Sequence, residues 1–342
     1  ANGRKAYEER YSWEIMERRL LKLYEKILTS HKKGATMSQI SDTSATNKKR
    51  KILLISLTVS PILGSHGRRV IPFLKYLHEF GWELDFLTVS PSSNFPLFDI
   101  SSVKNLPSSV KIFRVYQGFL RKIYYKNVCY NNSAISSRRN FNNRKNNFYK
   151  HFFEYLIFPI ISSRRNFNNR KNKIFKEMFI KILEKSKIII FEMNTCRLFD
   201  WSPFAIIKGV KLITRYNYDV LISSGLSDPH LIAYTIKKMK RKIPWIIDYG
   251  DPWVFASTYR DEHTKVKFVI DHWLEKRILK SASIITVTTE ETKKNYLENY
   301  LFLEKEKIKV IPMGTDYDVF KKIRAEHSEK FRILYTGSIY PT

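Results

Sequence analysis

Cysteine is nearly absent from this sequence, which excludes several classes of protein. Only Cys129 and Cys196 occur in 342 residues, too few for a disulfide framework or a cysteine-based metal cluster. We therefore expect a protein of a reducing compartment. Long apolar runs are also missing: the most apolar stretch, YLIFPII at 155–161, is far shorter than the roughly 20 residues that span a bilayer.

Acidic residues are outnumbered by basic ones. The chain has 61 Lys and Arg against 32 Asp and Glu, a formal net charge of +29. The excess is concentrated between Lys111 and Lys187, where 19 basic residues accompany three acidic ones. Such a block favours an anionic partner, either nucleic acid or an acidic membrane leaflet.

The basic block contains an internal repeat. ISSRRNFNNRKNNFYK at 135–150 recurs as ISSRRNFNNRKNKIFK at 161–176. Two copies are too few for a solenoid, so we interpret the repeat as a tandem duplication within an insertion. Its aromatic and basic residues suit a membrane interface, and they equally suit stacking and phosphate contacts with single-stranded nucleic acid.

From residue 51 the sequence alternates between apolar strands and amphipathic helices. KILLISLTVSP at 51–61 is typical of a buried parallel strand, and the helix after it ends at Gly81. One face of that helix carries Val70, Phe73, Leu74 and Leu77. Later strands are expected at 219–225, 244–248, 283–288 and 307–313, and later helices near 203–215, 229–240, 265–280 and 289–299.

This alternation predicts an α/β fold with a Rossmann-like, doubly wound parallel sheet. Gly64 and Gly67 do not complete a GxGxxG sequence, so the dinucleotide-binding fingerprint is absent. Before the sheet, residues 7–28 have the apolar spacing of one helical face, and the polar segment 32–50 is typical of a flexible linker.

Six stretches occur in the order seen in glycosyltransferase family 4. They are KILLISLTVSPILGSHGRRVIPFLKYLHEFGWELDFLTV, DWSPFAIIKGVKLITRYNYDVLISSG, IPWIIDYGDPW, LEKRILKSASIITVTTEETKKNYL, KIKVIPMGTDYDVF and RILYTGSIYP. Residues 51–342 therefore resemble the amino-terminal domain of that family plus the start of its carboxy-terminal domain. The resemblance implies a GT-B fold, in which two Rossmann-like domains face each other across a cleft. The first domain holds mainly the acceptor, and the second mainly the nucleotide-sugar.

The resemblance also implies a division into domains. Residues 51–320 correspond to the acceptor-side domain, with a basic helical or irregular insertion at about 117–187, and residues 321–342 to a linker and the first strand of a truncated second domain. Residues 1–31 resemble the carboxy-terminal helices of another such enzyme. On this interpretation the chain is a fragment that lacks most of the donor domain and is inactive alone as a transferase.

The resemblance points to PWIIDYGDPWVF at 244–255 as the acceptor site. Asp251 and Trp253 match the aspartate and tryptophan of the family's RDPW pattern, although Gly250 stands where the family usually has Arg or His. Asp251 is the candidate catalytic or acceptor-binding residue, and the alternative is that it caps the following segment. Asp248 ends the strand, and we expect it to be structural.

The remaining candidates for substrate binding come from three other segments. Gly64, Ser65, His66, Gly67 and Arg68 form a loop that either contacts a phosphate through backbone N–H groups or makes a tight strand-to-helix turn. His230 matches a histidine of the family's PPxSxH-like segment, and Asp316 lies in a sequence that resembles the PNGVD hinge. A structural role is the alternative for His230.

The predicted function is that of a glycosyltransferase, hexosyl or related, in cell-surface polysaccharide or glycolipid synthesis. The family commonly retains configuration and uses no bound metal, so we expect no cofactor besides the nucleotide-sugar donor. The expected partners are that donor, a lipid-linked or saccharide acceptor and an anionic membrane surface, in the cytoplasm or on the inner face of the cell membrane. The alternative is a non-catalytic basic module that binds nucleic acid or anionic membrane.

Overall fold

The structure is a computed structural model, and it describes residues 50–57, 59, 65–91, 110–118, 200–240, 242–256, 259 and 263–314. The predictions for residues 1–31, for nearly all of the 32–50 linker and the 117–187 insertion, for 321–342, and for Gly64 and Asp316 lie outside these residues.

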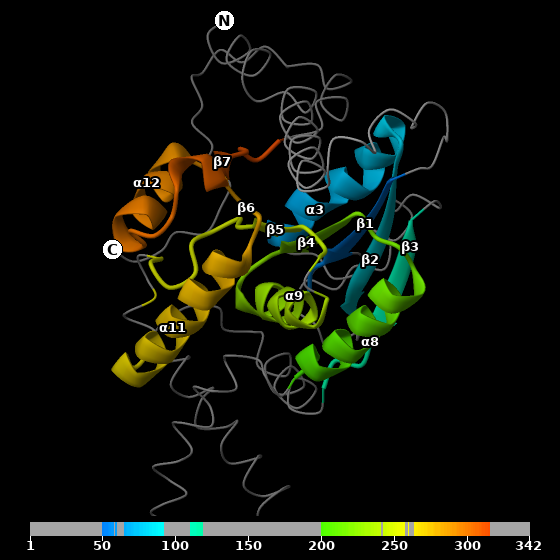
Figure 1. Cartoon of the computed structure of the whole chain (residues 1–342), viewed down its shortest axis with the longest axis horizontal. Helices are drawn as coiled ribbons and strands as arrows, with labels where there is room; N and C mark the ends of the chain where they lie inside the picture. Colours follow the sequence, from blue (N-terminus) through cyan, green and yellow to red (C-terminus); the bar gives the residue numbers. More distant parts are fainter. Residues whose placement is uncertain are drawn as a thin grey trace, which may run out of the picture.

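Seven strands form one sheet in the order β3-β2-β1-β4-β5-β6-β7, and every neighbouring pair is parallel (Figure 1). The strands are β1 (Arg50–Ile55), β2 (Trp82–Val89), β3 (Lys111–Val115), β4 (Val220–Ser224), β5 (Trp245–Asp248), β6 (Ile284–Val287) and β7 (Ile308–Val310). The strand order reverses direction between β1 and β4. This confirms the predicted Rossmann-like, doubly wound parallel sheet.

Helices cover both faces of the sheet. They are α3 (Ser65–Tyr76), α8 (Ser202–Arg215), α9 (Ser227–Met239), α11 (Lys265–Ser281) and α12 (Glu290–Asn299), with short 3₁₀ turns η3 (Leu77–Phe80) and η6 (Lys305–Lys307). Helix α3 packs on one face through Val70, Phe73 and Leu74. The other four helices contribute to the second core cluster, and α8, α9 and α11 lie side by side in Figure 1.

The central strand β1 shows why its sequence is apolar throughout. Ile52 and Leu54 belong to the core cluster under α3, whereas Leu53 and Ile55 belong to the cluster under α8 and α9. Because successive side chains point to opposite faces and both faces are covered, a run of apolar residues is required in place of an alternating one.

The strands and helices predicted between residues 200 and 314 are all present within two residues of their expected starts. Gly81 terminates η3 in the left-handed conformation, with φ 76°, as expected of a helix-ending glycine. Strand β3 was not anticipated, because its sequence KIFRV has two adjacent apolar residues, Ile112 and Phe113, and no strict alternation of apolar and polar residues. The segment 65–68 also differs from the expected loop, because it forms the first turn of α3.

Candidate functional site

The carboxyl ends of the parallel strands are where open α/β sheets bind ligands, especially beside the point where strand order reverses. That point lies here between β1 and β4. The edge is formed by the ends of β4, β5 and β6, by the start of α3 and by the residues after β7. Asp248 is the last residue of β5 and is buried at this edge.

Asp248 is held by three side chains from three different elements. Arg69 of α3 donates from Nε to both carboxylate oxygens at 2.9 Å and from Nη2 to Oδ1 at 2.6 Å. The hydroxyls of Ser224 and Thr286 donate to Oδ2 and Oδ1, each at 2.7 Å. Asp248 is therefore a fully engaged structural carboxylate, as the sequence indicated.

The electrostatics of Asp248 follow from these contacts. Burial alone would raise its pKa, but the charge of Arg69 and the hydrogen bonds from Arg69, Thr286 and Ser224 lower the pKa below its ordinary value. Arg69 also donates from Nη1 to the carbonyl oxygen of Ile311 at 3.0 Å. The pair thus joins α3 to β5 and to the segment after β7, and Asp248 has no proton to exchange near neutral pH.

His230 lies in the first turn of α9 and is completely buried. Its Nε2 is 3.0 Å from the carbonyl oxygen of Gly225, which can only accept, so Nε2 carries the proton. Its Nδ1 is 2.8 Å from the hydroxyl of Ser223, which also accepts a hydrogen bond from Nε1 of Trp245 at 2.9 Å. Both ring nitrogens of His230 have protein partners, which indicates a structural role. The predicted role of His230 in substrate binding stays a prediction.

The turn after β5 separates the two residues of the predicted acceptor site. Asp251 is exposed, whereas the Trp253 side chain is only 7% exposed and packs in the core. The carbonyl oxygen of Gly250 accepts a hydrogen bond from Thr288 at 3.1 Å, which fixes the turn to the end of β6. Asp251 is thus the carboxylate of this turn that can meet a ligand from solvent.

A buried glutamate lies beneath this turn. Glu275 of α11 accepts hydrogen bonds from the hydroxyls of Tyr296 at 2.9 Å and Tyr300 at 2.5 Å, and from the backbone N–H of Val254. The Tyr296 hydroxyl in turn accepts from the backbone N–H of Trp253 at 3.3 Å. Burial raises the pKa of Glu275 to about 7, although the tyrosine and backbone donors oppose that shift.

Sequence reasoning missed Arg69 and Glu275. Arg69 lies four residues before Phe73 and so shares the inward side of α3, which is a detectable signal for a buried cation. Glu275 lies four residues after Asp271 and is likewise completely buried. The side chains of Ser65, His66, Gly67 and Arg68 are outside the described part of the structure, so their predicted roles stay predictions.

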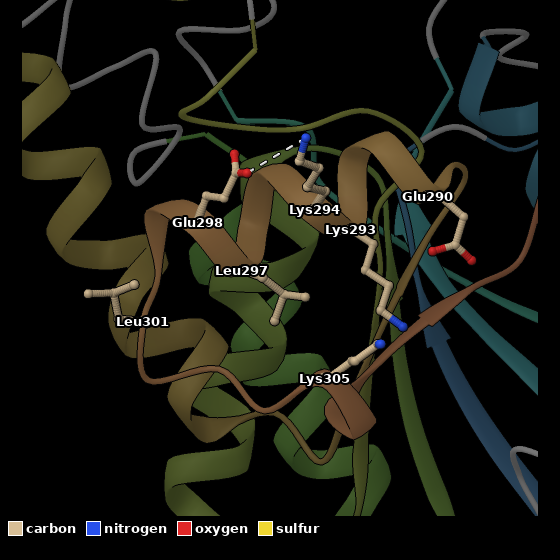
Figure 2. Close-up of a pocket in the computed structure, with 7 residues that line it drawn as sticks. All are labelled: Glu290, Lys293, Lys294, Leu297, Glu298, Leu301 and Lys305. Atoms are coloured by element: carbon tan, nitrogen blue, oxygen red, sulfur yellow. Dashed lines mark ion pairs between the residues drawn. The ribbon is translucent and has the colours of Figure 1, made fainter.

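An open groove of about 400 Å³ lies elsewhere, along α12 (Figure 2). It is lined by Glu290, Lys293, Lys294, Leu297, Glu298, Leu301 and Lys305. Lys294 and Glu298 form an exposed ion pair at 3.9 Å. None of the predicted site residues that the structure describes lines this groove, and its mixed charges favour no one sign of ligand.

Breaking the buried Arg69–Asp248 pair should destabilise the fold far more than breaking the exposed Lys294–Glu298 pair. Asp248→Ala leaves Arg69 charged and unpaired in the interior, so we expect a loss of about 3–5 kcal/mol in the free energy of unfolding, measured by urea denaturation. Lys294→Ala removes one partner of the exposed pair and is the matched control, with little measurable change expected. Equal effects of the two substitutions would contradict the structural role of Asp248.

Glu275 predicts a pH dependence of stability. Its folded pKa of about 7 lies above the ordinary value of 4.5, so the folded state binds the proton more tightly. Its contribution to stability is therefore complete below about pH 4.5 and is lost as pH rises through 7. In thermal unfolding between pH 5 and 8, Glu275→Gln should flatten this decline. Parallel pH profiles for the two proteins would refute the assignment.

No curated protein sequence matches this chain. Among solved structures it is similar to a UDP-glucosyltransferase from Polygonum tinctorium, described as capable of glucosylating indoxyl and 3,4-dichloroaniline, with 11% identity and a TM-score of 0.37. That match covers 79% of this chain and 54% of the other, so the chain spans about half the length of the protein it matches.

The sequence model described as Glycosyltransferase Family 4 matches residues 177–319. The matched range contains α8, β4, α9, β5, α11, β6, α12 and β7, and therefore Asp248, Asp251 and Glu275. Over residues 177–319, which include most of the carboxyl edge of the sheet, the chain is similar to glycosyltransferase family 4.

Proposed function

We propose that the described sheet is the acceptor-side domain of a glycosyltransferase that takes a sugar from a nucleotide-sugar donor. The observation that carries the proposal is the family match over residues 177–319, which contains β4 to β7 and their carboxyl ends. In our proposal the transfer retains configuration and serves the synthesis of cell-surface polysaccharide or glycolipid. It needs the nucleotide-sugar as co-substrate and no metal.

Asp248 and Asp251 have different roles in this proposal. Asp248 has its oxygens engaged by Arg69, Ser224 and Thr286, so it fixes the edge and does not meet the acceptor. Asp251 is exposed on the following turn, where its carboxylate accepts a hydrogen bond from an acceptor hydroxyl. This orients the hydroxyl oxygen toward the anomeric carbon of the donor sugar, and orientation of this kind can supply a large part of a rate enhancement.

Glu275 anchors the backbone of the turn that carries Asp251. It accepts from the N–H of Val254 and, through the Tyr296 hydroxyl, it is linked to the N–H of Trp253. The two residues after Pro252 are therefore anchored, while Asp251 stays at the surface. An acceptor can then be positioned by a short, fixed turn.

The test is acceptor binding by the full chain on an array of monosaccharides, disaccharides and polyprenyl-diphosphate-linked sugars. We expect retention of a defined subset, weakened at least tenfold by Asp251→Asn, because the amide loses the charge that strengthens the hydrogen bond. Glu79→Gln is the matched control, since Glu79 is an exposed acid of η3, just before β2 begins at the opposite edge.

Two outcomes would count against the proposal. Retention of no saccharide, or identical retention by the Asp251→Asn protein, would remove the acceptor site from this turn. Salt-sensitive binding of single-stranded RNA that the saccharides do not compete with would support the alternative, a basic nucleic-acid module.

A further inference from the structure

The outer face of α11 exposes an unusual set of apolar side chains. Val266, Val269 and Trp273 are 60%, 64% and 51% exposed. Their spacing of three and four residues places them in one stripe along the helix. The inner face of α11 is buried separately, through Ile278 and Leu279 among others, so the stripe is not needed for packing on the sheet.

The charges of α11 are sorted by face. Its exposed charged residues are all basic, namely Lys265, Lys276, Arg277 and Lys280. Its acids, Asp271 and Glu275, are completely buried. Asp271 is engaged by Lys267 and by the Tyr259 hydroxyl, and Glu275 by Tyr296 and Tyr300. The surface of α11 therefore presents cations and apolar groups with no negative charge.

Trp273 and Arg277 form a pair suited to a boundary between water and lipid. The guanidinium carbon of Arg277 lies over the Trp273 ring, 4.1 Å from its centroid. Tryptophan is enriched at membrane–water interfaces, where the ring body is apolar and the N–H remains hydrated. Arginine and lysine can bury their aliphatic stems while the charged ends stay at the headgroups.

We propose that the outer face of α11 docks the protein on an anionic phospholipid surface. Four exposed cations match the charge of such a surface, and the valine and tryptophan side chains match the boundary between headgroups and acyl chains. A second copy of this chain would bring the same cations against each other. Nucleic acid would use the cations and Trp273, but Val266 and Val269 offer no aromatic face for stacking bases.

Docking in this way would orient the candidate acceptor site. Helix α11 connects the parallel strands β5 and β6, so it runs antiparallel to them, and its first turn lies toward the carboxyl edge (Figure 1). When α11 lies in the plane of the membrane, the strands are parallel to that plane and the edge with Asp251 opens along the surface. This consequence for a lipid-linked acceptor rests on the proposed function, whereas the docking itself does not.

The test is co-sedimentation of the full chain with vesicles of phosphatidylcholine alone or with 30 mol% phosphatidylglycerol. We expect binding to the anionic vesicles only. Val269→Ser combined with Trp273→Ala, and separately Lys276→Glu combined with Arg277→Glu, should each weaken it at least about tenfold. Leu301→Ser is the matched control, because Leu301 is 91% exposed and lies outside α11, and it should bind as the unaltered chain does.

Each other outcome decides against the proposal. Absence of binding to the anionic vesicles, or equal binding by the α11 variants, would place any membrane contact elsewhere in the chain. Self-association in sedimentation velocity that disappears with Trp273→Ala would identify a second copy as the occupant. Asp251→Asn should bind vesicles normally, so failure of the docking proposal and failure of the acceptor-site proposal give different results.

Discussion

The ion pair between Arg69 and Asp248 is the constraint on which the carboxyl edge depends. It joins α3, which follows β1, to the end of β5, and its partners add β4, β6 and the residue after β7. It therefore spans the point where the strand order reverses. Removing two charges from water is costly, and apolar residues of equal volume are often as stabilising. The pair is better explained by the fixed geometry that the five hydrogen bonds to the Asp248 carboxylate give to the edge.

Asp248 and Glu275 are both buried near the edge, but their pKa values shift in opposite directions because their hydrogen-bond partners differ in charge. Asp248 is partnered by a guanidinium, whose charge more than compensates for burial and lowers the pKa. Glu275 has only neutral donors, so burial dominates and raises the pKa to about 7. Neither is free to meet a ligand, which leaves Asp251 as the exposed carboxylate of the turn after β5. Residue 251 can thus be replaced without altering the buried contacts of Asp248 and Glu275 that hold the turn in place.

The sequence predicted those features that depend on neighbouring residues. The apolar run at 51–55 indicated a strand covered on both faces. The helix expected near 289–299 is α12, and the structure shows that the Thr289 hydroxyl caps it by accepting from the N–H of Thr292 at 3.0 Å. The partners of Asp248 could not be predicted in this way, because Arg69 is 179 residues away along the chain. Glu275 was missed for a related reason: α11 is apolar on both its buried and its exposed sides, so periodicity does not distinguish an inward acid from an outward one.

Helix α11 also shows how net charge and surface charge differ. Counted along the sequence, its residues 265–281 contain five basic and two acidic side chains, which is an unremarkable excess. Folding turns both acids inward, where Tyr259, Lys267, Tyr296 and Tyr300 engage them. The outward face keeps only cations beside Val266, Val269 and Trp273. The buried acid that anchors the turn of Asp251 is therefore also one of the two acids whose burial leaves the outer face of α11 without negative charge. Glu275 therefore affects both the turn that carries Asp251 and the charge of the outer face of α11.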